Sequence, residues 1–133
     1  MSFTADPSGS LKSFITTHQA TPIDVLNMSI GDERTILIVL ALSAHCAALG
    51  SGAYAEPSIA ISKVGGQVLI NGLPGPFPIG LSAFPGPNPW TATLIPTLDG
   101  VKLQVTGDVG TDIDWRTALV AMNTISTPDP GFY

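Results

Sequence analysis

Charged side chains are scarce in this sequence. Only 11% of its 133 residues are Asp, Glu, Lys or Arg, whereas apolar residues make up 44%; an average soluble domain has about 25% charged residues. The high apolar content excludes a largely disordered chain. A soluble monomer needs charge on its surface. The low share of charged residues therefore predicts that other subunits cover part of the surface of this chain. The length fits a single domain with one core.

Clusters of basic residues are absent. The formal net charge is −5, and no two of the five cationic residues are adjacent. A protein that binds nucleic acid groups its Lys and Arg residues so that they displace counterions from the phosphates. We therefore expect no nucleic-acid partner. The five residues are Lys12, Arg34, Lys63, Lys102 and Arg116.

Metal ligands and activated nucleophiles are also few. The single cysteine, Cys46, excludes an intrachain disulfide, and its apolar surroundings favour a small buried hydrophobe. Neither His18 nor His45 lies near a Gly-x-Ser-x-Gly turn, and no phosphate-binding loop or His-Glu-x-x-His motif occurs. The sequence predicts no catalytic residue, no cofactor and no metal ion.

A calcium site is the one metal alternative. Asp108, Asp112 and Asp114 fall within one turn and the start of a strand, and Asp99 lies on a separate turn. Their spacing does not match the twelve-residue calcium loop. Solvated turn aspartates are therefore the interpretation that we prefer.

No secretory or membrane segment is expected. The N-terminus lacks a basic region followed by an apolar one, so it is not typical of a secretory signal. Residues 35–55 contain no charge and approach the length that spans a bilayer, but only residues 36–42 are strongly apolar. We interpret residues 35–45 as a central β-strand covered on both faces, with a helix over 40–49 as an alternative.

Alternation of apolar and polar residues predicts an all-β chain. Val101, Leu103 and Val105 alternate with polar residues, as in a strand with one wet face. Gly65-Gly66 separates two short strands, which indicates a hairpin. About seven strands with a turn signal near every tenth residue are typical of an antiparallel β-sandwich or jelly roll. Core packing is expected for Trp90 and for one face of the last strand: Ile113, Trp115, Thr117, Leu119 and Ala121.

Apolar flanks accompany the predicted sandwich. We expect an extended N-terminal arm over residues 1–20, one β-sandwich domain over 21–126 and a C-terminal tail over 127–133. Within the domain, residues 72–89 contain six prolines and no charge, which predicts an ordered loop or extended segment. This loop either folds over its own core or contacts a neighbouring subunit. The candidate subunit-contact residues are Phe14, Ile15, Phe77, Phe84, Phe132 and Tyr133.

Residues 90–120 resemble a module of small virion proteins of tailed bacteriophages. The shared outline is a strand, an Asp-Gly turn, a strand ending in Val-Thr-Gly, a glycine-containing loop and Ile-x-Trp at the start of the last strand. These features are Asp99-Gly100, Val105-Thr106-Gly107, Gly110 and Ile113-Asp114-Trp115. In that family the module ends a β-sandwich of tail, fibre and head-associated proteins, and it brings no catalytic residue.

The resemblance implies a structural protein of the virion. We favour a capsid decoration, or cement, protein that binds the major capsid protein, stabilises the shell and forms a homo-oligomer, with a trimer as one arrangement. The first alternative is a tail, baseplate or fibre module that recognises a host receptor or carbohydrate. A further alternative, a carbohydrate-binding or hydrolytic β-sandwich, predicts that Trp90 or Trp115 is exposed beside carboxylates.

Overall fold

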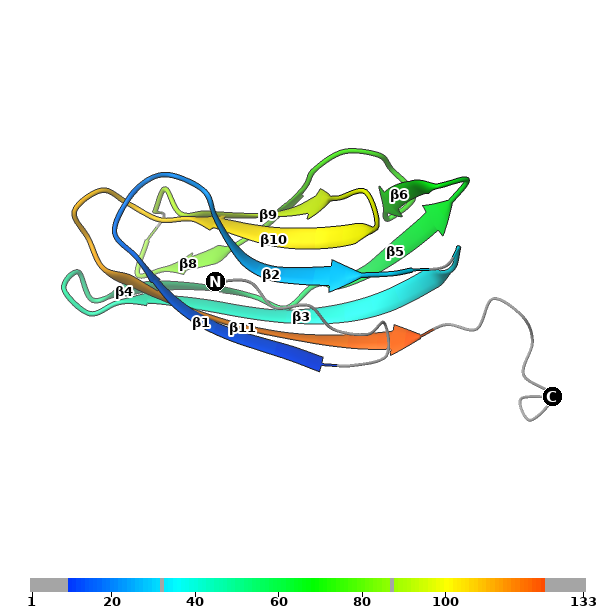
Figure 1. Cartoon of the computed structure of the whole chain (residues 1–133). Coiled ribbons are helices and arrows are strands. Elements are labelled where there is room, and N and C mark those ends of the chain that lie inside the picture. Colours follow the sequence, from blue (N-terminus) through cyan, green and yellow to red (C-terminus); the bar gives the residue numbers. More distant parts are fainter. Residues whose placement is uncertain (1–9, 32, 87, 124–133) are drawn as a thin grey trace.

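Two antiparallel sheets face each other in the computed structural model, which describes residues 10–31, 33–86 and 88–123 (Figure 1). The described residues contain no helix, and the predicted all-β sandwich is confirmed. The strands are β1 (Ser10–Thr17), β2 (Ile23–Ser29), β3 (Thr35–Cys46), β4 (Ser51–Ala55), β5 (Ser58–Val64), β6 (Gln67–Ile70), β7 (Phe77–Ile79), β8 (Ser82–Phe84), β9 (Thr91–Pro96), β10 (Gly100–Thr106) and β11 (Ile113–Asn123).

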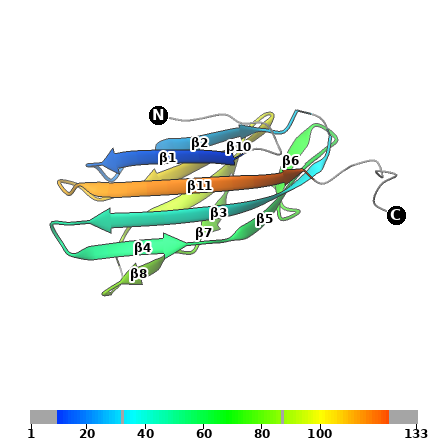
Figure 2. The ribbon, with the colours of Figure 1, turned by 90° about the horizontal axis from the view of Figure 1, so that it is seen from below.

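The large sheet has seven strands, with β3 at its centre. Its order is β1-β11-β3-β4-β8, and β5 followed by β6 pairs with the other half of β3 (Figure 2). The long β3 has room for two partners on one edge, because residues 42–46 pair with β4 and residues 35–39 pair with β5. The uncharged residues 35–55 are therefore two strands of this sheet. No helix among the described residues is long and apolar enough to cross a membrane.

The small sheet has four strands in the order β2-β10-β9-β7. Its outer face is polar, as the alternation along β10 predicts. The Gln104 Nε2 atom donates a hydrogen bond to Asp24 Oδ1 at 2.8 Å, and Lys102 Nζ lies 3.6 Å from Asp24 Oδ2.

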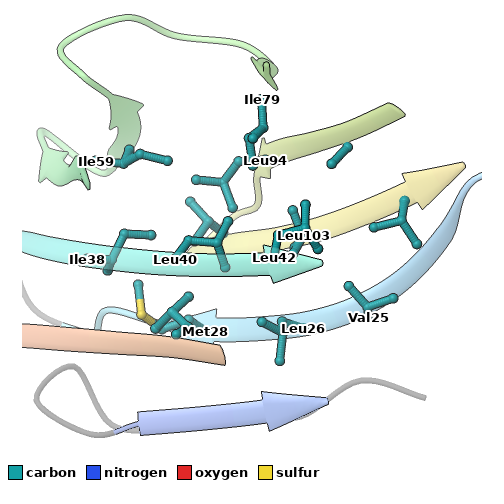
Figure 3. Close-up of a cluster of buried hydrophobic side chains, with 14 of the residues drawn as sticks. Val25, Leu26, Met28, Ile38, Leu40, Leu42, Ile59, Ile79, Leu94 and Leu103 are labelled. Carbon is teal, nitrogen blue, oxygen red and sulfur yellow. The ribbon is translucent and has the colours of Figure 1, made fainter. Parts of the chain in front are cut away.

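The core fills the space between the two sheets. Leu26 and Met28 of β2 and Leu103 of β10 meet Ile38 and Leu40 of β3 (Figure 3). Each of these side chains is almost fully buried. The sequence interpretation of Cys46, Trp90 and the inward face of β11 is confirmed, because all of them are buried.

The predicted hairpin is present. Strands β5 and β6 are antiparallel and joined at Gly65-Gly66, whose φ angles of 61° and 78° are of the sign that glycine adopts readily. The Glu33 carboxylate accepts hydrogen bonds from both glycine amides, at 2.8 Å and 3.2 Å. The turn is thus fixed by its glycines and by one carboxylate.

The N-terminal segment differs from the expected arm over residues 1–20. Strand β1 lies inside that range and pairs with β11 along its whole length, from Ser10 opposite Val120 to Thr17 opposite Ile113. Its inward positions include the hydroxyl residues Ser13 and Thr17, which conceal the apolar alternation of a strand. Residues 1–9 of the predicted arm and the whole predicted tail, 127–133, lie outside the described residues.

The proline-rich residues 72–89 contribute one edge strand to each sheet. Strand β7 lies at an edge of the small sheet and β8 at an edge of the large sheet. Pro78 occupies the middle of β7, where an edge position spares it the hydrogen bond that proline cannot donate. The segment therefore passes from one sheet to the other beside the core.

Candidate functional site

The outer face of the large sheet is open. Along β3 the inward side chains are buried, whereas Leu37 and Val39 are half-buried and Ala41 is exposed on the opposite side. The prediction that both faces of this strand are covered is therefore wrong for the described chain. We define the outer face by the outward side chains of four strands and the end of a fifth: Lys12, Phe14, Thr16, Leu37, Val39, Ala41, Ser43, His45, Tyr54, Phe84, Asp114, Arg116, Ala118 and Val120.

One row of large side chains crosses this face. The strand registers place Phe14 beside Arg116, Arg116 beside Ser43, and Ser43 beside Tyr54. Phe14 and Tyr54 are each 56% exposed. The Arg116 guanidinium lies over the Phe14 ring, 5.0 Å from its centre, a distance at which a cation is attracted to the ring face.

Phe84 extends the aromatic row at the edge of the sheet. Its ring centre is 6.4 Å from that of Tyr54, and 47% of the residue is exposed. The ring covers Gly52, where a Cβ atom would stand only 2.5 Å from a ring carbon. Glycine at this position therefore allows Phe84 to lie close against the sheet.

A trough lies next to the aromatic row. The neighbouring row pairs Lys12 with Ala118 and Ala118 with Ala41, so two alanines form the floor. The trough has a volume of about 550 Å³ and is lined by Lys12 at the β1 side and by Glu56, which follows β4, at the other side. Phe14, Tyr54 and Arg116 also line it.

This arrangement suits the burial of another molecule's surface. Exposed aromatic rings on a rigid sheet offer about 25 cal/mol of stabilisation for each Å² of apolar area that a partner covers. Aromatic residues and Arg dominate the energy of many protein interfaces. Phe14, Tyr54 and Arg116 are therefore the residues through which this face would bind most strongly.

The six sequence-predicted contact residues divide into three groups. Phe14 and Phe84 lie on the outer face, where both are exposed. Ile15 and Phe77 are half-buried and pack against the core. Phe132 and Tyr133 lie outside the described residues. The structure adds Tyr54 and Arg116, which sequence reasoning did not single out as contacts.

The four aspartates considered for calcium each have their own partner. Asp99 accepts a hydrogen bond from Lys63 Nζ at 2.8 Å, and Asp114 accepts one from Thr16 Oγ1 at 2.8 Å. Asp112 pairs with the His18 ring, and Asp108 binds the backbone amide of its neighbour. No group of three or more potential metal ligands occurs in residues 10–31, 33–86 and 88–123.

Lys63 lowers the pKa of the Asp99 carboxyl group. The hydrogen bond from the Lys63 ammonium, aided by its positive charge, lowers the pKa of Asp99 below its usual value of 3.8. Lys63 Nζ also donates to the Gly31 carbonyl oxygen at 2.9 Å. This ion pair ties β5 of the large sheet to the turn between β9 and β10 of the small sheet.

Neither tryptophan exposes its ring as a platform for a ligand, although Trp90 lines two surface pockets. Trp90 and Trp115 are buried, and their rings pack edge to face with centres 6.3 Å apart. The Trp115 indole N–H donates a hydrogen bond to Thr17 Oγ1 at 2.9 Å. Core packing, the preferred interpretation of both tryptophans, is confirmed, and neither is the exposed tryptophan that the carbohydrate-binding or hydrolytic alternative requires.

Comparison of the chain with protein-family models, with curated protein sequences and with solved structures finds no match.

Proposed function

We propose that this chain is a non-enzymatic structural subunit of a tailed-bacteriophage virion, where it decorates and stabilises the shell. The observation that carries the proposal is the open outer face of the large sheet. Phe14 and Tyr54 are exposed there, and Val120 is 50% exposed. Several exposed apolar side chains gathered on one face mark an interaction surface more often than a free one.

The two outer faces of the sandwich differ in a way that supports a one-sided contact. The small sheet presents hydrogen-bonded polar groups, among them Gln104, Asp24 and Lys102. The large sheet presents exposed aromatic and aliphatic side chains, among them Phe14, Tyr54 and Val120, between charged ones. Since the whole chain has few charges, covering the large sheet would remove the least soluble part of the molecule from water.

Rigidity favours binding through this face. The outward side chains stand on strands that are hydrogen-bonded to neighbours and packed on a filled core. A surface that is already ordered loses little conformational entropy when it binds. The Arg116 contact with Phe14 and the packing of Phe84 over Gly52 add to this order.

The phage assignment rests on the resemblance of residues 90–120 to the virion module. These residues supply β9, β10 and most of β11, and β11 contributes Arg116, Ala118 and Val120 to the outer face. The segment that resembles virion proteins thus includes part of the proposed contact surface.

Binding to empty shells tests the proposal. The full chain would be mixed with shells assembled from the major capsid protein of the phage genome that encodes it, and the bound fraction measured by sedimentation. We expect saturable binding and loss of most of it in Tyr54→Lys. Thr91→Lys, an exposed position on the outer face of the small sheet, is the matched control and should bind normally. Absence of binding by the unmodified chain would overturn the assignment.

The trough supports a second candidate, a tail, baseplate or fibre module that recognises a host receptor or carbohydrate. Aromatic walls beside Lys12, Glu56 and Arg116 combine the apolar and polar groups that a small-molecule site requires. Binding of the full chain to host cells that is lost in Tyr54→Ala, together with no binding to shells, would favour this candidate over the first.

A further inference from the structure

The outer face carries similar side chains at several matched positions on the two sides of the boundary between β11 and β3. Across this boundary Ala118 lies beside Ala41, and Val120 lies beside Val39. In the aromatic row Phe14 stands on β1 and Tyr54 on β4, at equal distances from this boundary, while Phe84 of β8 lies beyond Tyr54 without a counterpart beyond β1 in the part of the chain that the structure describes. Small, aliphatic and aromatic side chains therefore recur at matched positions on the two halves.

The charges on the two halves are opposite. Lys12 stands at the β1 side of the trough and Glu56 at the β4 side. Opposed charges on the two halves make the face complementary in charge to a copy of itself that is turned over, and the long Arg116 at the position matched by the short Ser43 adds complementarity of shape.

We propose that a second copy of this chain covers the outer face, about a two-fold axis that runs along the strands between β11 and β3. Such an axis exchanges β1 with β4 and β11 with β3. Each Phe14 then faces Tyr54 of the second copy, and each Lys12 faces Glu56 of the second copy. The long Arg116 side chain faces the short Ser43, and alanine faces alanine at the centre.

The charges select this axis over the perpendicular one. A two-fold axis across the strands, along the trough, would bring Lys12 of one copy against Lys12 of the other and Glu56 against Glu56. Like charges that face each other across an interface are repulsive and count against that arrangement. The axis along the strands is also compatible with aligned packing of two sheets, about 10 Å apart and rotated by about 30°.

The size of the face predicts a weak dimer. Four strands at about 4.8 Å spacing and seven residues at about 3.3 Å give a footprint of roughly 450 Å² on each copy. The pair would bury about 900 Å² when the two faces are treated as flat, without the extra area of protruding side chains. This is close to the lower limit of about 1,000 Å² for a specific interface. We therefore expect weak association, to be measured at concentrations up to several hundred micromolar. The inference shares its surface with the proposed function: a chain whose outer face is covered by a second copy must dissociate before that face binds a shell, which a weak dimer permits.

A charge exchange tests the pairing. In one chain Lys12 and Glu56 are separated by three strand spacings, about 14 Å, so they can meet only between copies. Lys12→Glu and Glu56→Lys should each weaken the dimer about tenfold, since two pairs turn repulsive. The double variant should restore the dissociation constant to within about threefold of the unmodified chain. Sedimentation equilibrium measures all four proteins, and thermal unfolding checks that each is folded.

Cysteine cross-linking tests the same contact without relying on affinity. Lys12→Cys and Glu56→Cys proteins would be prepared separately, mixed and treated with a short bismaleimide, because Cα atoms on sheets about 10 Å apart are too distant for a direct disulfide. The mixture should give a cross-linked pair of chains. Neither protein alone should give one to a comparable extent, because like positions lie about 17 Å apart, three strand spacings along the sheet and one sheet spacing across the interface. The native Cys46 is buried and should not interfere.

The outcomes separate this inference from the proposed function. A chain that remains monomeric at several hundred micromolar, or a double charge variant that is weaker than both single ones, overturns the two-fold contact. If that monomer still binds shells through Tyr54, the proposed function stands and the shell itself is the occupant of the outer face. If the dimer forms as described but shells are not bound, the two-fold contact stands and the virion assignment falls.

Discussion

The indole N–H of Trp115 donates a buried hydrogen bond to the hydroxyl of Thr17, at 2.9 Å. The two residues come from neighbouring strands, β11 and β1, at the end of the large sheet. Trp115 also packs edge to face against Trp90, which precedes β9 of the small sheet. One indole therefore joins β1, β11 and the opposite sheet.

Replacement of Thr17 by Val should destabilise the protein. Valine keeps the shape of threonine but removes the acceptor, which leaves the buried indole N–H without its partner at a cost of about 1–3 kcal/mol. Thr17→Ser keeps the acceptor and should lose only about 1 kcal/mol, for one buried methyl group. Urea unfolding followed by tryptophan fluorescence measures both. A Val variant as stable as the unmodified chain would contradict the account of this bond.

Gly100 should tolerate no larger residue. A Cβ atom there would stand 1.8 Å from the Met28 carbonyl oxygen, because β2 and β10 approach closely at this point. Gly100→Ala should cost about 3 kcal/mol or more, or prevent folding. Gly80→Ala is the control, since its Cβ would meet no atom within 4 Å, and it should change the free energy of unfolding by less than about 0.5 kcal/mol. Equal stability of the two variants would show that the strands can separate at Gly100.

The Lys63–Asp99 pair should make stability depend on pH in acid. Lys63 lowers the pKa of Asp99 below 3.8, so the folded state favours the ionised carboxylate. The contribution of this ion pair to the free energy of unfolding is complete above the ordinary pKa of an aspartate. It disappears as the pH falls through the lowered pKa of Asp99. Asp99→Asn should therefore be less stable than the unmodified chain at pH 7, and the difference should shrink toward pH 2. Chemical denaturation at both pH values measures it, and a difference that stays constant would exclude Asp99 as its source.

The sequence was sufficient for the strands whose apolar and polar positions alternate. In β10 and β11 the inward residues are apolar or hydroxyl-bearing and the turns contain glycine, so strand limits and facing could be predicted. The position of Trp115 in the core follows from the same period of two. The Gly65-Gly66 hairpin follows from the need for positive φ angles.

The outer face could not be predicted from the sequence. Strand β3 has apolar residues on both of its faces, and the sequence does not show which face is covered. Residues 36–42 of β3 are all apolar. Such a run ordinarily indicates a strand that is buried on both faces. Only the register shows that Phe14, Arg116 and Tyr54, which are distant in sequence, share one row. Strand β1 could not be recognised from the sequence, because Ser13 and Thr17 occupy inward positions where apolar residues are expected.

Hydroxyl-radical footprinting of the shell-bound chain tests the central claim, that the outer face of the large sheet is a subunit contact. Oxidation of Phe14 and Tyr54 would be compared between the dilute free chain and the bound chain by mass spectrometry. Leu98, which is 91% exposed on the turn between β9 and β10, serves as the internal reference. The account predicts that binding lowers the oxidation of Phe14 and Tyr54 several-fold relative to Leu98. Equal oxidation in the free and bound states would contradict it.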